Sequence, residues 1–328
     1  MITVLERKVG EMKTSIRNSN TGRRALIKAA VVVATVLTGS SVATSAHAAY
    51  PGENGRILFT SDRTGSDQIY SMRPDGGDVR RLAHGFDTDW SPDGRWIAFD
   101  RRSATNPSRV EVFVMRRDGR DVRQVTHLSG FNFEASWSPN GRLLVFERAP
   151  SIGCCQNIYS IRPDGRGLRK LTHATTARSP AEPEFSPDGR WIAFEQFPST
   201  APPSAIYVMR ANGTHVRRVT PLRLDAAHPE WSPDGSLIIF NNHFTLPVGD
   251  IFTIRPNGTG LNRLTHVIPR GEADYRPDFS PDGKRIVFQH QTTPDAPSGV
   301  FVMNADGSNP QLIRRFAFLP DWGPSPKD

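Results

Sequence analysis

The sequence contains little cysteine and no excess of charged residues. Only two of the 328 residues are cysteine, and charged residues make up 23% against 37% hydrophobic ones. The shortage of cysteine excludes a small disulfide-stabilised scaffold, and the apolar content excludes a disordered chain. In contrast, 27 glycines and 27 prolines are present. These turn-forming residues argue against a helical bundle and favour a large β-rich globular protein.

Several catalytic signatures are also missing. The sequence has no G-x-S-x-G nucleophile elbow, no P-loop, no H-E-x-x-H and no G-x-G-x-x-G unit after a strand. The absence of the first motif excludes a peptidase of the α/β-hydrolase type, and the others exclude common nucleotide-dependent and zinc-dependent enzymes. We therefore expect a binding protein more than an enzyme.

The net charge of +8 is concentrated at the start of the chain. Residues 1–48 hold seven basic and two acidic residues, so five of the eight net charges belong to this segment. A short apolar run over residues 29–37 and the sequence Ala46-His47-Ala48 follow the basic residues. A basic region, an apolar region too short to span a bilayer and an A-x-A site are typical of an export signal. We predict cleavage after Ala48 and no nucleic-acid partner.

The export route is indicated by a second feature of this segment. The stretch Gly22-Arg23-Arg24-Ala25-Leu26-Ile27-Lys28 resembles the twin-arginine export motif, with Gly22 in place of the usual Ser or Thr. We expect twin-arginine export, with the general route as the alternative. The mature chain should be periplasmic or secreted, without a transmembrane span.

The remaining residues contain an internal repeat. A motif of the type W-S-P-D-G recurs at intervals of 46 to 48 residues, at residues 90–94, 137–141, 185–189, 231–235 and 279–283. Each motif predicts a tight turn, because Pro fixes φ and Gly accepts a positive φ. An apolar strand, an alternating strand and a short basic strand follow each turn. Four antiparallel strands repeated at this period predict an all-β fold, a six-bladed β-propeller over residues 49–328.

The two chain ends complete the last predicted blade. Asp321-Trp322-Gly323-Pro324 resembles the start of a further repeat, and residues 54–59 match the strand that should follow it. With W-S-P-D-G, I-Y-x-M and R-R-L-T elements along nearly all of the mature chain, the sequence resembles the TolB-like six-bladed propeller family with its WD40-like repeats. This resemblance implies a role in the cell envelope, although the α/β domain that precedes the propeller of TolB is not recognisable here.

The inner strands of the predicted blades carry the candidate site. Two positions on each strand should point toward the central channel, because side chains alternate along a strand. The position before the repeat Trp or Phe holds Asp89, Ser136, Glu184, Glu230, Asp278 and Asp321. The position two residues earlier holds Asp87, Glu134, Glu182, His228, Arg276 and Leu319.

Three hypotheses follow for these channel residues. The acids could hold Ca²⁺ or attract a cationic peptide, so the chain would be a monomeric scaffold for a protein or peptide partner in the envelope. Alternatively, they only bond backbone amides and fix one blade against the next. As a third hypothesis, His228, His243 and His290, with Glu195 and Gln289, form the site of an enzyme acting on acidic oligosaccharides. Variable loops on one face, residues 102–109, 149–156, 197–204, 243–249 and 291–298, would add to recognition.

Overall fold

The protein is represented by a computed structural model that describes most residues after the predicted export signal. The described ranges are 50–103, 106, 109–151, 155–174, 178–198, 203–242, 249–267, 272–292 and 297–326. They belong to the second of two units, residues 43–328. Residues 1–49 and His243 lie outside these ranges, as do parts of all five expected variable loops.

The described strands form antiparallel sheets of one recurring type. Three sheets follow the chain order: β12 (Arg178–Phe185), β13 (Trp191–Pro198), β14 (Ala205–Arg210) and β15 (Arg217–Arg218); β16 (Ala226–Trp231), β17 (Ile238–Asn242), β18 (Ile251–Ile254) and β19 (Asn262–Arg263); β20 (Ala273–Phe279), β21 (Arg285–Gln291), β22 (Gly299–Asn304) and β23 (Gln311–Arg315). A short 3₁₀ helix, η2 (Leu222–Leu224), precedes β16.

Two further sheets complete the set. A larger sheet contains eight strands: β4 (Phe86–Trp90), β5 (Trp96–Arg102), β6 (Val110–Arg116), β7 (Arg123–Gln124), β8 (Phe131–Trp137), β9 (Leu144–Ala149), β10 (Asn157–Ile161) and β11 (Arg169–Lys170). The last sheet joins both ends of the chain, in the order β24 (Phe318–Pro324), β1 (Asn54–Ser61), β2 (Gln68–Met72) and β3 (Arg80–His84).

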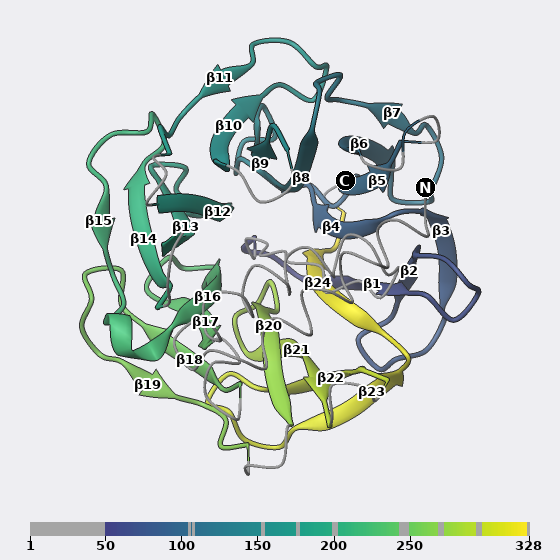
Figure 1. Cartoon of the computed structure of the whole chain (residues 1–328). Helices are drawn as coiled ribbons and strands as arrows, with labels where there is room; N and C mark the ends of the chain where they lie inside the picture. Colours follow the sequence, from purple (N-terminus) through teal and green to yellow (C-terminus); the bar gives the residue numbers. More distant parts are fainter. Residues whose placement is uncertain are drawn as a thin grey trace, which may run out of the picture. The chain divides into compact units, whose positions relative to one another are not determined.

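The sheets stand side by side around a common axis (Figure 1). Each inner strand contacts the next one, from β4 through β8, β12, β16 and β20 to β24, and β24 contacts β4 again. The short strands β7, β11, β15 and β19 lie at the rim and are exposed. The prediction of an all-β propeller built from four-stranded antiparallel blades is therefore confirmed.

The W-S-P-D-G motifs form the tight turns that the sequence predicts. In the first of them, the Gly94 N–H donates to the Ser91 carbonyl at 2.8 Å, and Gly94 has a φ of 65°. The Ser91 hydroxyl accepts from the Trp96 N–H at 2.8 Å and donates to Asp93 at 2.6 Å. A serine and the Asp or Asn two residues after it accept the backbone N–H groups of each turn. Each motif therefore joins an inner strand to the next strand with defined geometry.

The second strand of each unit is apolar because its residues are buried between neighbouring sheets. One phenylalanine on each of these strands is at most 2% exposed: Phe59, Phe99, Phe146, Phe194, Phe240 and Phe288. Each ring packs on an aromatic ring of the third strand, with centroids 5.3 to 5.9 Å apart. Burial of a side chain of this size contributes about 1.5–3 kcal/mol, so these rings are a major part of the core.

A bulge interrupts every inner strand at the same place. Between Ala181 and Glu184 of β12, for example, the register with β13 shifts by one residue. Six bulge residues adopt left-handed φ values of 47° to 56°: Asp87, Glu134, Glu182, His228, Arg276 and Leu319. This conformation is unfavourable for residues other than glycine, by about 1–2 kcal/mol each. Simple alternation along the strand therefore did not describe these positions correctly.

Candidate binding site in the axial channel

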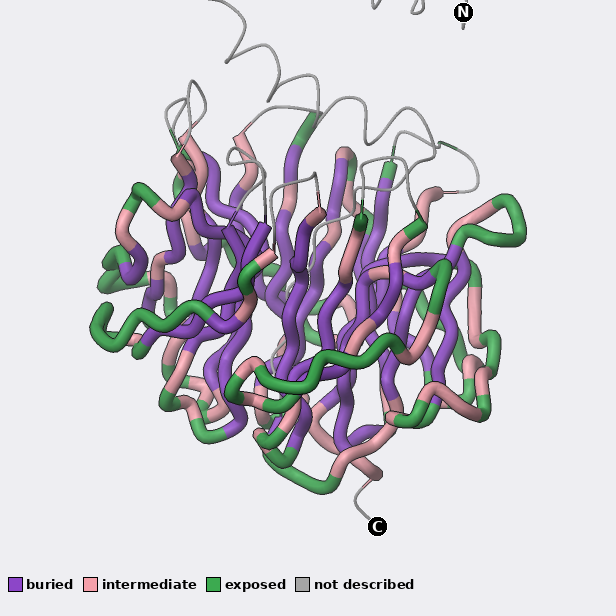
Figure 2. Tube along the Cα trace, turned by 90° about the horizontal axis from the view of Figure 1, so that it is seen from below, coloured by how far each residue is buried: buried purple, intermediate pink, exposed green. Residues whose placement is uncertain are grey.

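The predicted channel residues form two layers at different depths. We call Asp89, Ser136, Glu184, Glu230, Asp278 and Asp321 the turn-side layer, because the tight turns follow them directly. The six bulge residues lie farther from those turns and form the loop-side layer. All twelve residues are at most 5% exposed. Figure 2 shows the buried inner strands running between the two faces of the ring.

Three of the five turn-side acids, all aspartates, bond the backbone of the neighbouring blade. The Trp137 N–H donates to Asp89 at 2.6 Å, and the Trp322 N–H donates to Asp278 at 2.7 Å. In the same way, Asp321 accepts from the Trp90 N–H at 3.1 Å. These bonds tie β4 to β8, β20 to β24 and β24 to β4, a contact of the kind that the structural hypothesis for these acids expects.

The turn-side layer also surrounds a tyrosine from the start of the described chain. Tyr50 is 3% exposed, and its hydroxyl donates to the Trp137 carbonyl. Burial and the nearby carboxyls raise the pKa of Tyr50 well above its usual value, so the hydroxyl stays protonated. Burial likewise raises the pKa of all five acids of the layer, listed here: Asp89, Glu184, Glu230, Asp278 and Asp321.

Four of the six bulges of the loop-side layer are capped by second-strand side chains of the preceding blade, while the His228 N–H donates to the bulge residue Glu182 at 2.8 Å. The Glu134 N–H donates to Asp100 at 2.7 Å, and the Glu182 N–H hydrogen-bonds Glu147. Amide side chains do the same elsewhere. The Arg276 N–H donates to Asn241 at 3.0 Å, and the Leu319 N–H donates to Gln289 at 3.2 Å. We call the residues at this second-strand position the cap residues: Thr60, Asp100, Glu147, Glu195, Asn241 and Gln289.

The sequence interpretation missed the cap residues as a group. Only Glu195 and Gln289 were singled out, as part of an enzyme site. A signal was nevertheless present, because every cap residue directly follows the buried phenylalanine of the second strand. A polar residue recurring at one position of an apolar strand predicts a buried hydrogen-bonding role.

Charge is distributed unevenly around the loop-side half of the channel. The strands β4, β5, β8, β9, β12 and β13 contribute only acids at the bulge and cap positions: Asp87, Asp100, Glu134, Glu147, Glu182 and Glu195. On the other half, the same positions hold His228, Asn241, Arg276, Gln289, Leu319 and Thr60. The channel therefore has an acidic half and a neutral-to-basic half.

The acids of the acidic half influence one another. Burial is the largest cause that raises the pKa of Asp100, Glu134 and Glu182 well above the usual range, and neighbouring carboxylates add to it. Burial also raises the pKa of Glu147 to about 7. Arg276 extends from the other half to within 3.7 Å of Asp87. Its guanidinium is the cation that faces Asp87, Glu182 and Glu134 from the other half of the channel.

The histidines of the third hypothesis have separate partners. His228 lies 2.9 Å from Asn241 through Nδ1 and 3.3 Å from Glu182 through Nε2. His290 instead contacts Asp274 at 2.7 Å, and this hydrogen bond raises the pKa of the imidazole. His243 lies outside the described residues.

Gln289 and Glu195, the other two members of that hypothesis, are also buried. The Gln289 side-chain amide donates to Tyr275 at 2.9 Å and to Ser298 at 2.7 Å. The structure thus brings His228 to Glu182 in the channel, while His290 pairs with Asp274.

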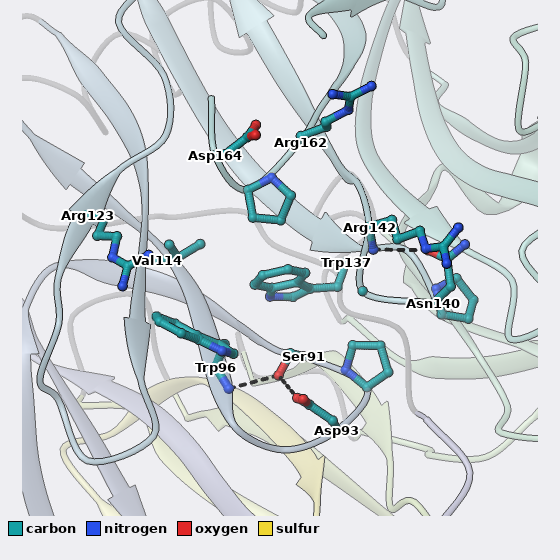
Figure 3. A pocket seen from close by; sticks show the side chains of 14 residues that line it. Ser91, Asp93, Trp96, Val114, Arg123, Trp137, Asn140, Arg142, Arg162 and Asp164 are labelled. Carbon is teal, nitrogen blue, oxygen red and sulfur yellow. Dashed lines mark hydrogen bonds between the residues drawn. The ribbon is translucent and has the colours of Figure 1, made fainter. Parts of the chain in front are cut away.

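A pocket of about 880 Å³ lies outside the channel, between the β4–β7 and β8–β11 strands. Figure 3 shows the indole rings of Trp96 and Trp137 facing this space, with Arg123 and Arg142 at its sides. Its lining combines two tryptophans with three arginines and two aspartates. The sequence interpretation did not predict this pocket, because its residues come from three turns and from four strands, β5 to β8.

Among the described residues, no three His, Cys, Asp or Glu side chains are arranged to hold a metal ion. The same residues include no helix with the length and hydropathy that membrane crossing needs.

A closed ring of four-stranded antiparallel blades around a polar channel defines a β-propeller. The family model of the TolB beta propeller domain matches residues 25–181 and 89–325. The chain therefore belongs to this family, and the predicted resemblance to TolB-like propellers is confirmed. No match was found among curated proteins.

Solved structures give the same fold at low sequence identity. TolB from Acinetobacter baumannii is 20% identical, with a TM-score of 0.68, over 93% of this chain and 73% of that protein. A putative TolB from Agrobacterium tumefaciens is 21% identical, with a TM-score of 0.60, over 79% and 88%. An oligogalacturonate lyase in complex with manganese is 13% identical, with a TM-score of 0.52, over 80% and 89%. Identities this low support the fold alone.

Proposed function

We propose that this chain is an exported six-bladed propeller that binds a cationic segment of a protein partner at the loop-side half of its channel. The partner would lie in the cell envelope, and the chain would act as a scaffold without catalysis. Membership in the TolB beta propeller domain family and the predicted export signal both favour this function.

The blade count rests on how the eight-stranded sheet is built. Its two antiparallel halves, β4 to β7 and β8 to β11, are joined by a single parallel residue pair, Val110 with Phe131. If each half is one blade, the four remaining sheets bring the number to six, in agreement with the repeat. Six blades leave a narrow channel that side chains line.

One observation carries the functional proposal: acids occupy cap positions where neutral amides serve equally well. Asn241 and Gln289 accept the same kind of backbone N–H bond that Asp100 accepts. Bonding the bulge therefore does not require a carboxylate, and burying one is costly. The concentration of acids on three neighbouring blades needs another reason, and attraction of a cationic ligand provides it.

The chemistry of the channel favours a lysine or arginine side chain as the occupant. Ca²⁺, which prefers carboxylate oxygens, is the competing occupant. An acidic oligosaccharide is disfavoured, because its carboxylates would meet those of the acidic half at short range. Thus the enzyme hypothesis fits the charge of the channel less well than the scaffold hypothesis.

The test compares two triple variants of the exported full-length chain. In the channel variant, Asp100→Asn, Glu147→Gln and Glu195→Gln remove charge but keep hydrogen-bond acceptors at the caps. In the matched control, Asp75→Asn, Asp118→Asn and Asp164→Asn remove three carboxylates from exposed second turns. Pull-down from an envelope extract would identify partners, and calorimetry with a lysine-rich peptide and with CaCl₂ would measure affinity.

We expect the channel variant to lose partner and peptide binding by about tenfold or more, since several charge contacts are removed. The control should bind like the wild type. Equal binding by both variants would overturn the channel site. Loss of Ca²⁺ binding alone, with partner binding unchanged, would overturn the cationic segment in favour of a metal ion.

A further inference from the structure

The pocket outside the channel contains two arginines that lack the acidic partner found on other blades. Arg142 and Arg162 line this space of about 880 Å³, from the side of the β8–β11 strands (Figure 3). Both residues are exposed, and neither side chain forms an ion pair within the described residues. In each case the missing acid can be traced to one residue that departs from the repeat.

Next to Arg142, an asparagine takes the place of the aspartate of the repeated turn. The other four motifs of this type have an acid at that position: Asp93, Asp188, Asp234 and Asp282. In one of them, Asp188 lies 3.9 Å from Arg190, which corresponds to Arg142. Asn140 still accepts the turn's hydrogen bond from the Arg142 N–H at 3.0 Å, but it carries no charge. The turn therefore keeps its shape while Arg142 is left without a carboxylate.

Next to Arg162, a glycine takes the place of an aspartate. On the preceding blade the corresponding residues are Arg116 and Asp121, whose side chains lie 3.5 Å apart. Gly167 has a φ of 70° and Asp121 one of 56°, so both turns use a left-handed residue here. A Cβ at Gly167 would lie 3.6 Å from Nε of Arg162. This turn therefore has room for the acid that the blade lacks.

The third arginine of the pocket does not bridge the gap between the two blades. Arg123 donates through Nε to Asp121 of its own turn at 3.0 Å, and its guanidinium lies over Trp96, 5.2 Å from the ring centroid. At the corresponding position two blades farther on, Arg217 instead donates to the Pro256 carbonyl of the next blade at 2.6 Å. Because Arg123 is held on its own blade, it does not tie the two walls of the pocket together.

The lining also offers acceptors and apolar surface. Asp93 and Asp164 each use Oδ1 to accept a backbone N–H within their own turns, at 3.0 and 2.9 Å. Since a carboxylate has two oxygens, the second one of each can accept a hydrogen bond from a ligand. Trp96, Val114 and Trp137 supply the apolar part of the lining. A matching ligand therefore combines an anion, hydrogen-bond donors and an apolar face.

We infer that this pocket binds an acidic saccharide, a sugar that carries a carboxylate on its ring. The carboxylate would pair with Arg142 and Arg162, because a guanidinium matches the two oxygens of a carboxylate. Sugar hydroxyls both donate and accept, so they suit Asp93 and Asp164 as well as the remaining guanidinium N–H groups. The C–H face of the ring would lie against the indoles, which provide flat apolar surface.

Two other anionic ligands fit the pocket less well. The side chains of an acidic peptide bring only acceptors, so they would meet the carboxylates of Asp93 and Asp164 without donating to them. An inorganic anion would leave most of the space unfilled, since about 880 Å³ is a volume typical of sites for organic ligands.

The inference is independent of the function proposed for the channel. The lining of the pocket includes no residue of the turn-side layer, the loop-side layer or the caps. A saccharide in the pocket and a cationic segment in the channel would therefore bind without competing. Failure of one site to bind its ligand would leave the other proposal to its own test.

The experiment uses the full chain and two variants of the pocket. In the first, Arg142→Gln and Arg162→Gln remove the two unpaired cations. In the second, Asn140→Asp and Gly167→Asp restore the acids that other blades carry at these positions, so the arginines remain but are neutralised. The two variants change different residues, and a folding defect in one, detected by its melting temperature, leaves the other as the test.

A control variant and three probes complete the design. In the control, Arg120→Gln and Arg166→Gln remove two exposed arginines of second turns that do not line the pocket. Calorimetry would measure the affinity of each chain for a glucuronate trisaccharide, for a glucose trisaccharide with the same linkages, and for a tri-glutamate peptide blocked at both ends. The peptide carries the same charge as the acidic trisaccharide, and the glucose probe has the same shape without charge.

We expect the wild type and the control to bind the glucuronate trisaccharide about tenfold or more tightly than either other probe. Both pocket variants should lose about tenfold or more of this affinity. Equal binding of the glucuronate probe by the pocket variants and the control would overturn the site, as would the absence of binding by the wild type. Tighter binding of the glutamate peptide would overturn the saccharide and assign the pocket to an acidic peptide.

Discussion

The turn-side and loop-side layers lie two positions apart on the same inner strands, yet their side chains vary in different ways. The turn-side layer repeats a carboxyl group in five of six strands, and three of these acids bond the backbone of the next blade. The loop-side layer changes from acids to His228, Arg276 and Leu319 around the ring. Residues that repeat with the blades serve the architecture, whereas residues that depart from the repeat form the site at which we propose that a ligand binds.

We expect the largest loss of folding stability when the single arginine of the loop-side layer is replaced. Arg276→Met leaves Asp87, Glu134 and Glu182 without their buried cation, and breaking a buried ion pair typically costs about 3–5 kcal/mol. Urea unfolding should show this loss at pH 8 and a smaller loss at pH 5, where more carboxyls are protonated. The same loss at both pH values would mean that Arg276 stabilises the ring by packing and not by charge. Arg276→Lys serves as the charge-conserving control.

The buried acids of the acidic half should make the stability of the protein depend on pH. The pKa of Glu147 is raised from 4.5 to about 7, so the folded chain holds a proton that the unfolded chain releases between these values. Stability should therefore decrease as the pH rises from about 4.5 to 7 and then level off, with a total loss of about 3 kcal/mol for this group.

Glu147→Gln should reduce this decrease and make the protein more stable than the wild type at pH 8. Thermal melts between pH 4.5 and 8.5 would measure both changes. A variant with the same pH profile as the wild type would show that Glu147 is not the titrating group.

We expect the smallest change in stability at Asp188, which lies in one of the repeated turns. Asp188 accepts from the Ser186 hydroxyl at 2.6 Å and from the Arg190 N–H at 3.0 Å. In the equivalent turn, Asn140 accepts the same two bonds at 2.9 and 3.0 Å. Chemical denaturation should therefore find Asp188→Asn within about 0.5 kcal/mol of the wild type and Asp188→Ala less stable by about 1 kcal/mol. A clear loss in the Asn variant would show that the turn needs the charge.

The sequence predicted the repeated elements well because each is a local pattern. The turn residues, the buried phenylalanines and the pairing of residues 54–59 with the C-terminal strand all follow from motifs that can be aligned by eye. The channel acids were also placed on the inner strands correctly. Whether they bind a ligand remains a prediction.

The bulges and their caps could not be predicted in the same way. A left-handed residue such as Glu182 has no sequence signature, because non-glycine residues seldom adopt this conformation. The cap residues belong to strands that look uniformly apolar, and their partners lie on another blade. Hydrogen bonds between blades depend on how the sheets are packed, which no single repeat contains.

The pairing of β24 with β1 has a consequence for the order in which the protein folds. Leu58 pairs with Asp321, so the last sheet needs segments from both ends of the chain. Contacts between distant segments form slowly, because the entropy of closing so long a loop must be overcome first. The other sheets can form from consecutive segments as soon as these are synthesised, but the ring can close only after the final strand has left the ribosome. A chain that is truncated before β24 therefore cannot close the ring.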